Sequence, residues 1–432
     1  MPRFRVTCET CDREIPPDRA VRRCPSCAGK LTFAYALDGV VWPPTGGGMW
    51  AYRQLLPLVD PANEISLGEG DTPLLRAHGD WGCRLYWKNE GLNPTGSQKA
   101  RALALAISRA REVKALRVVI ASTGSAAVAA AAYCARAGLP CLVLVPRGTP
   151  RERLAPITLL GARVVEFQGT FLQIEALLDT LEHDPGWYDA TTRRVANPFQ
   201  AEAPKTIAYE IVAQLGRVPD WVVVPVGGGA TLFGIWRGFQ DLLRAGRITR
   251  VPRLAGVQPT QFNTLERALA QGLRTAAELE LIAMDETVDT VLRNLKHGIP
   301  PDAPDALRAL RDSGGIAVSV TDEAACLAQA RIGREEGIVC EPSAAASASA
   351  VEALTRAGRL ARSDTVVCLL TGSGFRETGG LPPAAPVPLA PDAEPAALDQ
   401  LVPLERARPE RHTRDRADLG RSALPPANRT IT

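Results

Sequence analysis

Short apolar runs alternate with Ala-rich or amphipathic stretches through most of the chain. The runs have the length of buried strands and several lead into Gly, Ser or Thr, whereas the stretches between them have helical length. Strand, helix and strand at this spacing predict parallel βαβ units, so we expect an α/β fold. The predicted strands cover residues 117–121, 140–146, 163–167, 221–225, 254–258, 317–320 and 365–370, and the predicted helices cover 100–111, 126–137, 150–160 and 206–214.

The alternation falls into two series, which predicts two parallel-sheet α/β domains with a crevice between them. A length of 432 residues agrees, because one hydrophobic core rarely supports a chain of this size. Frequent prolines and arginines near the C-terminus interrupt helices and sheet ladders, so we expect a poorly ordered tail. The expected parts are an N-terminal ribbon at 1–38, a larger domain at 39–110 and 195–380, a smaller domain at 111–194, and the tail at 381–432.

One lysine, Lys99, stands in an unusual setting at the start of the predicted helix 100–111. It follows a turn sequence, NPTG at 93–96, and Ser97 or Gln98 lies near the helix cap. The positive end of the helix dipole disfavours a cation there, and a neutral lysine carries less of that cost. Lysines that react with carbonyl groups need a lowered pKa or a desolvated pocket. From this stretch alone, Lys99 is either such a lysine or one that faces solvent.

Composition and charge exclude several classes of function. A net charge of +3 is too small to indicate binding to nucleic acid or to a membrane surface. No apolar run reaches transmembrane length, and the first ten residues, MPRFRVTCET, lack the apolar core of a signal peptide. We therefore predict a cytoplasmic protein with a small-molecule substrate and without a nucleic-acid or membrane partner.

Four of the ten cysteines form two knuckles, Cys8 with Cys11 and Cys24 with Cys27. A disulfide framework is not expected in the cytoplasm. Two Cys-x2-Cys pairs separated by twelve residues are typical of a structural Zn²⁺ site. Because four thiolates leave no open coordination position, we assign the predicted zinc to folding rather than to catalysis.

Three loops rich in Gly, Ser and Thr follow predicted strands, at residues 122–125, 227–231 and 371–374. Successive glycines, as in GGG at 227–229, let backbone N–H groups converge on an anion at a helix N-terminus. This loop lacks the lysine of a P-loop and the spacing of a dinucleotide fingerprint, so those ligands fit poorly. Together with Lys99, the loops indicate a phosphorylated cofactor that lies across the crevice.

These motifs occur in an order that resembles one enzyme family. The ordered set is EGLNPTGSQKAR at 90–101, STG at 122–124, VPVGGG at 224–229 and LTGSG at 370–374, supported by NPF at 197–199, KTIAYE at 205–210 and GIVCEPS at 337–343. On these motifs the chain is similar to the threonine synthases and, more broadly, to the pyridoxal-phosphate enzymes of the tryptophan synthase β-subunit fold, fold type II. The four-cysteine ribbon is also common among threonine synthases.

The resemblance implies a role for each matching position. Lys99 would bind pyridoxal 5'-phosphate covalently and later shuttle protons, and Thr371 would hydrogen-bond the pyridine nitrogen. The implied cofactor-binding residues are Lys99, Ser125, Gly227, Gly228, Gly229, Ala230, Thr231 and Thr371. The implied substrate-binding residues, which would hold the carboxylate, are Ser122, Thr123 and Gly124.

The resemblance also implies a reaction, that of a pyridoxal-phosphate-dependent carbon–oxygen lyase. In threonine synthases phosphate leaves the γ carbon of O-phosphohomoserine and water adds at the β carbon, with the cofactor as electron sink. Three single positions differ from the family pattern, because Gln98 replaces the usual Phe, Ala100 the usual Asp and Ser125 the usual Asn. The segment AEAP at 201–204 also departs from it, since threonine synthases tend to have Glu-Gly there. A close variant of the reaction in a specialised pathway therefore stays open.

Two further interpretations are open. The same fold supports β-elimination or β-replacement on serine-, phosphoserine- or cysteine-like substrates. The altered residues would also suit a binding or regulatory paralogue, although the retained Lys99 argues against it.

Two other sites stay ambiguous. Lys88 is either functional or part of a salt bridge, and Lys296 with His297 could contact a substrate phosphate. Relatives of this fold commonly pair, so we expect a homodimer.

Overall fold

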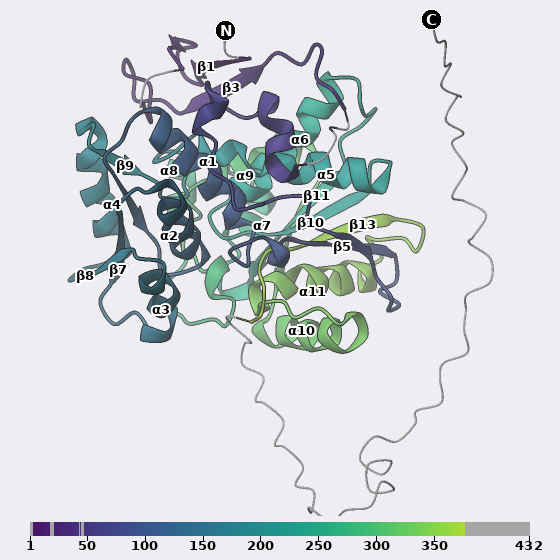
Figure 1. The fold of residues 1–432 in the computed structure, drawn as a ribbon. Coiled ribbons are helices and arrows are strands. Elements are labelled where there is room, and N and C mark those ends of the chain that lie inside the picture. Colours follow the sequence, from purple (N-terminus) through teal and green to yellow (C-terminus); the bar gives the residue numbers. More distant parts are fainter. Residues whose placement is uncertain (1–2, 18–20, 43, 45–46, 376–432) are drawn as a thin grey trace, which may run out of the picture. The chain divides into compact units, whose positions relative to one another are not determined.

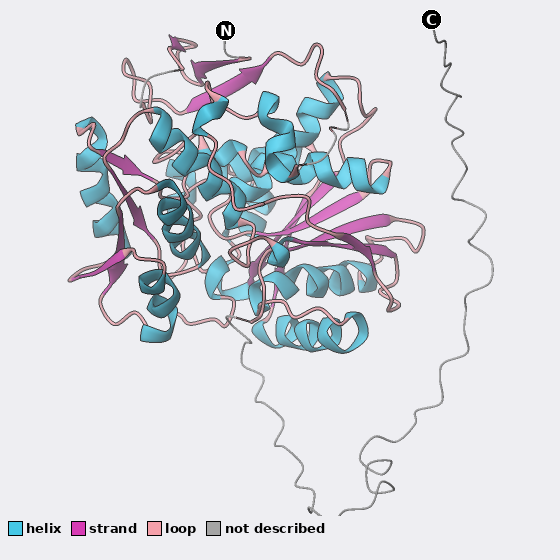
Figure 2. Cartoon of the chain, viewed as in Figure 1, coloured by secondary structure: helices cyan, strands magenta, loops and turns pink. Residues whose placement is uncertain are grey.

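The computed structural model describes residues 3–17, 21–42, 44 and 47–375, and the predicted tail at 381–432 lies outside the described residues. The strands in this part of the chain form one three-stranded, one six-stranded and one four-stranded sheet (Figures 1 and 2). The two larger sheets are built from parallel neighbours almost throughout, so the prediction of an α/β fold with parallel sheets is confirmed.

The six-stranded sheet collects the strands of the second series together with the strand that leads into the lysine loop. Its only antiparallel pairing among the described strands is at one edge, between β4 and β5. The short edge strand β4 was not predicted. In spatial order the strands are β12 (Ile316–Val320), β11 (Arg253–Pro259), β10 (Trp221–Pro225), β13 (Thr365–Leu370), β5 (Arg84–Asn89) and β4 (Leu74–Arg76).

Helices cover both faces of this sheet, which explains its continuous apolar strands. Along β10, Val222 and Val224 belong to one core and Trp221 and Val223 to another, because successive side chains point to opposite faces. The first core is closed by α5 (Lys205–Leu215), α6 (Ala230–Arg244), α7 (Thr264–Gln271), α8 (Ala276–Glu280) and α9 (Ala303–Asp312). The second is closed by α10 (Asp322–Glu336) and α11 (Pro342–Arg356), drawn beneath the sheet in Figure 1.

The four-stranded sheet holds the first series, in the order β8 (Arg163–Phe167), β7 (Cys141–Pro146), β6 (Arg117–Ala121) and β9 (Trp187–Asp189). One face packs on α4 (Phe171–Asp179). The other face shares a core with α1 (Lys99–Glu112), α2 (Ser125–Ala137) and α3 (Arg151–Leu159). Neither β9 nor α4 was predicted, although the Thr170–Gln173 capping box was a usable signal for α4.

The third sheet is antiparallel and comes from the N-terminus, in the order β2 (Glu14–Ile15), β1 (Phe4–Cys8) and β3 (Leu31–Tyr35). We call the described residues 3–17 and 21–35 the N-terminal ribbon. Alternate residues of β1 are buried, and they join the core of α5, α6 and α9. The ribbon therefore packs on the helices of the six-stranded sheet and is not merely joined to them by a linker.

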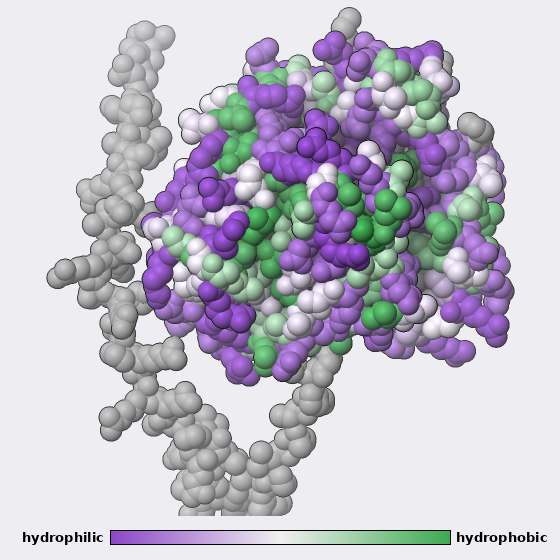
Figure 3. All heavy atoms as spheres, turned by 180° about the vertical axis from the view of Figure 1, so that it is seen from behind, coloured by the Kyte–Doolittle hydropathy of each residue, from purple (hydrophilic) through white to green (hydrophobic). Residues whose placement is uncertain are grey.

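The surface of the described residues is mixed. Figure 3 shows groups of hydrophobic residues lying between hydrophilic ones on one face of the molecule. Exposed large apolar side chains include Leu159, Leu172 and Leu281, and scattered residues of this kind are normal on globular proteins. None of the helices in this part of the chain combines the length and the apolar character needed to cross a membrane.

Candidate active site

A cavity of about 460 Å³ opens where loops from both parallel sheets meet. The loop after β6 contributes residues 122–125, the loop after β10 contributes 227–231, and Thr371 follows β13. Lys99 lines the same cavity. Ligand sites in parallel α/β sheets form at the carboxyl ends of strands, and all these loops leave such ends. The structure thus brings together every residue that the sequence assigned to cofactor or substrate binding.

Lys99 is the first residue of α1, and its side chain is partly exposed, toward the cavity. Its Nζ atom donates a hydrogen bond to Oγ1 of Thr192 at 3.3 Å. Burial lowers the pKa of Lys99 to about 8, and the carboxylate of Asp302 partly opposes that shift. About one lysine in ten is then neutral at pH 7, far more than for an ordinary lysine. This environment suits a lysine that attacks carbonyl groups.

Backbone hydrogen bonds fasten the lysine loop to the loop that follows β13. The N–H group of Gln98 donates to the carbonyl of Thr371 at 2.9 Å, and the N–H group of Ser373 donates to the carbonyl of Gly96 at 2.8 Å. Gly96 has a φ of 72°, a left-handed conformation that costs glycine little. Because of these bonds, Thr371 is fixed beside the beginning of α1.

The glycine loop before α6 is a close-fitting cradle. A Cβ atom on Gly227 would lie 2.4 Å from the carbonyl oxygen of Asn294, so a larger residue does not fit. Gly229 has a φ of 101° and is the N-cap of α6, a helix of fifteen residues. The free N–H groups and the dipole at such a helix N-terminus attract anions. The carbonyl of Gly228 accepts from the N–H of Asp302 at 2.8 Å, which holds the loop against the segment that begins α9.

The loop at 122–125 leads into α2 in a similar way. Its Gly124 is the helix N-cap, and the N–H group of Gly124 donates to Oγ of Ser122 at 3.2 Å. This second helix N-terminus also favours an anion. Of the three residues that differ from the family pattern, Gln98 and Ser125 line the cavity, whereas Ala100 is fully buried in the protein.

Cationic side chains line the cavity in addition to Lys99. They come from α3, from the loop after β9 and from the segment before α9, and no motif spacing links them in the sequence. Sequence reasoning pointed only to Lys296, which lies at the cavity together with the partly buried His297. Burial lowers the pKa of His297, so its imidazole is mostly neutral at neutral pH. The cations are Arg153, Arg193, Arg293 and Lys296.

Asn294 joins several loops of the site and was missed by sequence reasoning. Its Nδ2 atom donates to Oε2 of Glu341 at 3.0 Å, and its Oδ1 atom would lie 3.3 Å from a Cβ on Gly124. A Cβ on Gly372 would come within 2.7 Å of the Glu341 carboxyl group. A glycine at 372 therefore leaves room for the Glu341 carboxyl group in its present position.

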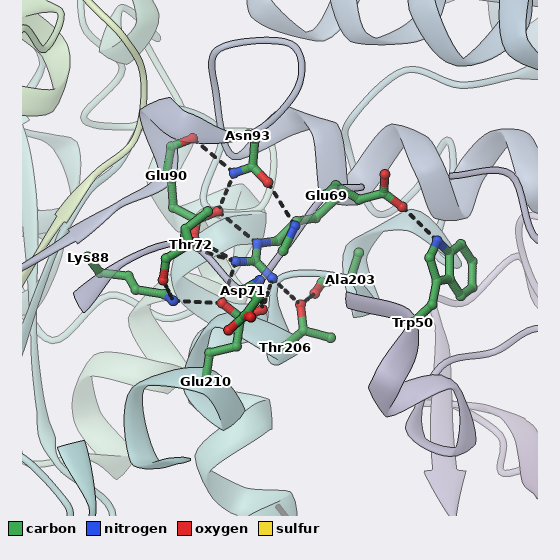
Figure 4. A network of polar contacts seen from close by, with 12 residues as sticks. Trp50, Glu69, Asp71, Thr72, Lys88, Glu90, Asn93, Ala203, Thr206 and Glu210 are labelled. Atoms are coloured by element: carbon green, nitrogen blue, oxygen red, sulfur yellow. Dashed lines mark hydrogen bonds and ion pairs between the residues drawn. The ribbon is translucent and has the colours of Figure 1, made fainter. Parts of the chain in front are cut away.

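A buried polar network lies behind the lysine loop (Figure 4). Arg101 forms ion pairs with Glu90 at 2.7 Å and with Glu210 at 2.5 Å, and all three side chains are almost completely buried. Nζ of Lys88 contacts Glu210 Oε2 and the carbonyl of Thr72, both at 2.6 Å. Two cations and two carboxylates balance here, and they tie α1 to β5 and α5. The salt-bridge interpretation of Lys88 is confirmed.

The four ribbon cysteines also come together. Their sulfur atoms lie within 4.8 Å of one another, and Cys8–Cys27, Cys11–Cys24 and Cys11–Cys27 are separated by 3.5, 3.6 and 3.5 Å. Four sulfurs bound tetrahedrally to Zn²⁺ at about 2.3 Å would stand about 3.8 Å apart. The donor set and its spacing fit a closed metal site.

Comparisons with known proteins agree with this geometry. Residues 65–372 match the family model described as pyridoxal-phosphate dependent enzyme. The chain is 33% identical to the threonine synthase of Methanocaldococcus jannaschii over 91% of this chain and 98% of that protein. It is 36% identical to the threonine synthase of Synechocystis sp. over 76% of this chain and 82% of that protein.

Solved structures share the fold. A threonine deaminase from Solanum lycopersicum superposes with a TM-score of 0.60 at 22% identity, covering 76% of this chain and 86% of that one. A fungal L-serine ammonia-lyase from Rhizomucor miehei gives a TM-score of 0.58 at 21% identity, covering 70% and 93%. Taken with the cavity and its lysine, the family and sequence matches show that the chain belongs to the pyridoxal-phosphate-dependent enzymes, as a lyase of the threonine synthase type.

Proposed function

We propose that the protein converts O-phosphohomoserine and water into threonine and inorganic phosphate. The observation that carries the proposal is a cavity with two kinds of anion site. The glycine cradle at 227–229 suits the phosphate of the cofactor, and the cations Arg153, Arg293 and Lys296 line the same cavity. A substrate that brings its own phosphate needs such a second set of positive charges.

The residues present fit pyridoxal 5'-phosphate. Gly227, Gly228, Gly229, Ala230 and Thr231 would hold its phosphate with backbone N–H groups at the start of α6, where a side chain on Gly227 would not fit. Lys99 would form the covalent attachment, Thr371 would hydrogen-bond the pyridine nitrogen, and Ser125 would lie beside the ring. When bound, the cofactor supplies an electron sink for the removal of protons next to the amino group.

The remaining residues bind and orient the substrate. Ser122, Thr123 and Gly124 hold its carboxylate at the N-terminus of α2, where the helix dipole favours negative charge. The Lys99 amine would move protons in the reaction, since its pKa of about 8 makes both protonation states accessible. Phosphate leaves the γ carbon toward the cations, and a water molecule adds at the β carbon. One water is consumed for each phosphate released.

The test compares substrates on the purified protein supplied with pyridoxal 5'-phosphate. O-phosphohomoserine should yield threonine and phosphate in equal amounts, and Lys99→Ala should abolish both. O-phosphoserine, serine and threonine are the matched three- and four-carbon alternatives. Ammonia or a replacement product from these, with no phosphate from O-phosphohomoserine, would overturn the proposal in favour of β-elimination or β-replacement. No turnover of any substrate by the cofactor-loaded protein would favour the binding paralogue.

The ribbon holds a structural Zn²⁺ in this proposal. Cys8, Cys11, Cys24 and Cys27 would supply four thiolates, and the sulfur spacing supports that set. Because no position is left for water or substrate, the metal serves folding. Metal analysis of the purified protein should find about one Zn²⁺ per chain, and Cys11→Ser should lose it. Full zinc content in that variant would contradict the assignment.

Three other expectations remain predictions. A homodimer and a cytoplasmic location are two of them. The third is the division into a larger and a smaller α/β domain around the cavity. Because α1 shares a core with the four-stranded sheet, a boundary before Lys99 suits the packing better than one at residue 110.

A further inference from the structure

The N-terminal ribbon is held to the main body by a set of charged contacts centred on Arg194. Its Nη2 atom donates to Oε1 of Glu9 at 2.8 Å and to the carbonyl of Leu31 at 3.0 Å, both in the ribbon. Its Nη1 atom lies 2.7 Å from Oδ2 of Asp305 in α9. Lys30 of the ribbon reaches the same oxygen at 2.8 Å. Two ribbon residues thus hold the guanidinium of Arg194, and a third holds its carboxylate partner.

The backbone of Arg194 continues this connection to the glycine cradle. Its N–H group donates to Oδ1 of Asp302 at 3.1 Å, and the N–H group of Asp302 donates to the carbonyl of Gly228 at 2.8 Å. Asp302 is fully buried, and a Cβ on Gly229 would meet its carbonyl oxygen at 2.9 Å. The path from ribbon to cradle therefore consists of direct contacts at every step.

The same chain segment reaches the reactive lysine. Thr192, two residues before Arg194, accepts the hydrogen bond from Nζ of Lys99. Arg194 also stacks on Phe233 of α6, with its guanidinium carbon 4.6 Å from the ring centre. The Arg194 side chain thus lies between the ribbon and α6, the helix that begins at the cradle. Its own chain segment contains Thr192, which contacts Lys99.

The charges along this path should affect how strongly the cradle binds a phosphate. Asp302 and Asp305 place two carboxylates behind the cradle, where uncompensated negative charge would repel a phosphate. Burial and Asp305 raise the pKa of Asp302 to about 6, and Lys30 and Arg194 oppose that shift. Loss of Lys30 would leave Arg194 as the only cation in contact with Asp305 among the described ion pairs.

We propose that the N-terminal ribbon is a positioning element of the cofactor site, and that Lys30 and Arg194 are positioning residues for the phosphate cradle. Neither residue lines the cavity, so both act through Asp302 and Gly228. The proposal rests on the cofactor that the family membership gives and not on the substrate or reaction proposed above. It also predicts that the metal of the ribbon and the cofactor affect each other's binding, as linkage requires.

The test measures the affinity of the cofactor-free full-length protein for two ligands, pyridoxal 5'-phosphate and pyridoxal, by absorbance titration. Both react with Lys99, but only the first uses the cradle. Lys30→Met should weaken binding of pyridoxal 5'-phosphate by about fivefold or more, in the range that changes along connected networks produce. Binding of pyridoxal should stay unchanged. Lys30→Arg should restore the affinity, because it keeps the charge.

Arg5→Met is the matched control, since Arg5 lies on an exposed position of the same ribbon and loses the same charge. It should leave both affinities unchanged. Equal binding of pyridoxal 5'-phosphate by Lys30→Met and by the control would overturn the proposal, as would an equal loss for both ligands, which indicates general loosening. If Lys30→Met does not fold, Lys30→Gln removes the same charge but keeps a polar side chain. It should show the same selective loss of affinity for pyridoxal 5'-phosphate, and an unchanged affinity would again overturn the proposal. Neither readout depends on turnover of O-phosphohomoserine, so a failure of the proposed reaction is seen separately.

Discussion

Lys88 and Lys99 are eleven residues apart in the sequence, and the fold gives the two amines different surroundings. The ammonium of Lys88 has three donors, and all three are used, by the carbonyl of Thr72 and by the side chains of Glu210 and Gln214. Lys99 donates one hydrogen bond, to Thr192, and forms no ion pair within the described part of the chain. Its amine lines the cavity.

The difference shows what makes a buried lysine reactive. Burial lowers the pKa of both amines, and carboxylates oppose the shift in both. Lys88, however, is in direct contact with Glu210 and its side chain is completely buried, so its charge is part of the structure. Lys99 keeps an accessible amine, and among the described residues Asp302 is the carboxylate that influences its pKa. Contact and access, more than burial, separate the structural lysine from the reactive one.

Removing the reactive lysine should produce the largest functional effect. Lys99→Ala should lower kcat by at least about 10⁴-fold, the upper range for a group that transfers protons, because the covalent attachment of the cofactor is lost as well. The thermal unfolding temperature of the cofactor-free protein should hardly change, because Lys99 has no ion pair to lose among the described residues. Steady-state kinetics of the protein supplied with cofactor and a thermal scan of the cofactor-free protein measure the two effects. A large fall in unfolding temperature would place Lys99 in the same class as Lys88.

Disrupting the buried ion-pair network around Lys88 should lower the stability of the protein. Glu210→Gln leaves Arg101 and Lys88 with one carboxylate fewer in a dry site, so we expect a loss of about 3–5 kcal/mol in the free energy of unfolding. Chemical denaturation measures it. Asp312→Asn, which breaks an exposed pair with Arg308, is the control and should cost at most about 1 kcal/mol. Similar losses for the two variants would contradict the role given to the network.

The network also predicts the sign of an acid effect. Burial alone would raise the pKa of Glu210, but Arg101 and Lys88 lower it to about 2. A carboxylate with a depressed pKa in the folded state contributes stability that is present above its ordinary pKa of about 4.5 and is lost as the pH falls toward 2. Wild-type unfolding free energy should therefore fall across that window, and Glu210→Gln should flatten the fall. An unchanged slope in the variant would argue against this assignment.

Removing a positive charge from the cavity wall should weaken the binding of a phosphorylated substrate. Lys296→Met should raise KM for O-phosphohomoserine by about tenfold, as expected for one lost charged hydrogen bond, with less effect on kcat. Serine and threonine, which carry no phosphate, are the control ligands. An equal loss for phosphorylated and unphosphorylated ligands would show that Lys296 shapes the cavity rather than binding phosphate.

The smallest expected effect is the pH dependence of cofactor attachment. With a pKa of about 8, the neutral fraction of Lys99 rises about tenfold between pH 7 and pH 9 and then levels off. The rate at which the cofactor-free protein takes up pyridoxal 5'-phosphate should follow this curve. A rate that keeps rising without a plateau to pH 10 would indicate an ordinary lysine.

Much of this arrangement could be predicted from the sequence. Strands 117–121, 221–225 and 365–370 have the predicted bounds, because buried parallel strands are continuous apolar runs set apart by glycine-rich turns. The site loops were found for the same reason, since each follows such a strand. Strand 163–167 also has its predicted bounds, although it lies at the edge of its sheet and is largely exposed. Local patterns of this kind need no knowledge of the tertiary structure.

Other parts depend on contacts between distant residues. Asn294, Thr192 and Asp302 carry no motif, and their places near Lys99 or the cradle follow only from the fold. β9 has three residues, which is too short for an apolar period to appear. Lys88 stayed ambiguous because its partner Glu210 lies far along the chain.

The most direct test of the central claim is to identify the lysine that carries the cofactor. The holoenzyme would be reduced with borohydride, which makes the bond between cofactor and lysine permanent, and then digested and analysed by mass spectrometry. We predict the added mass on the peptide that contains Lys99 and none on the peptide that contains Lys88. Modification of Lys88, or of any lysine other than Lys99, would contradict the account.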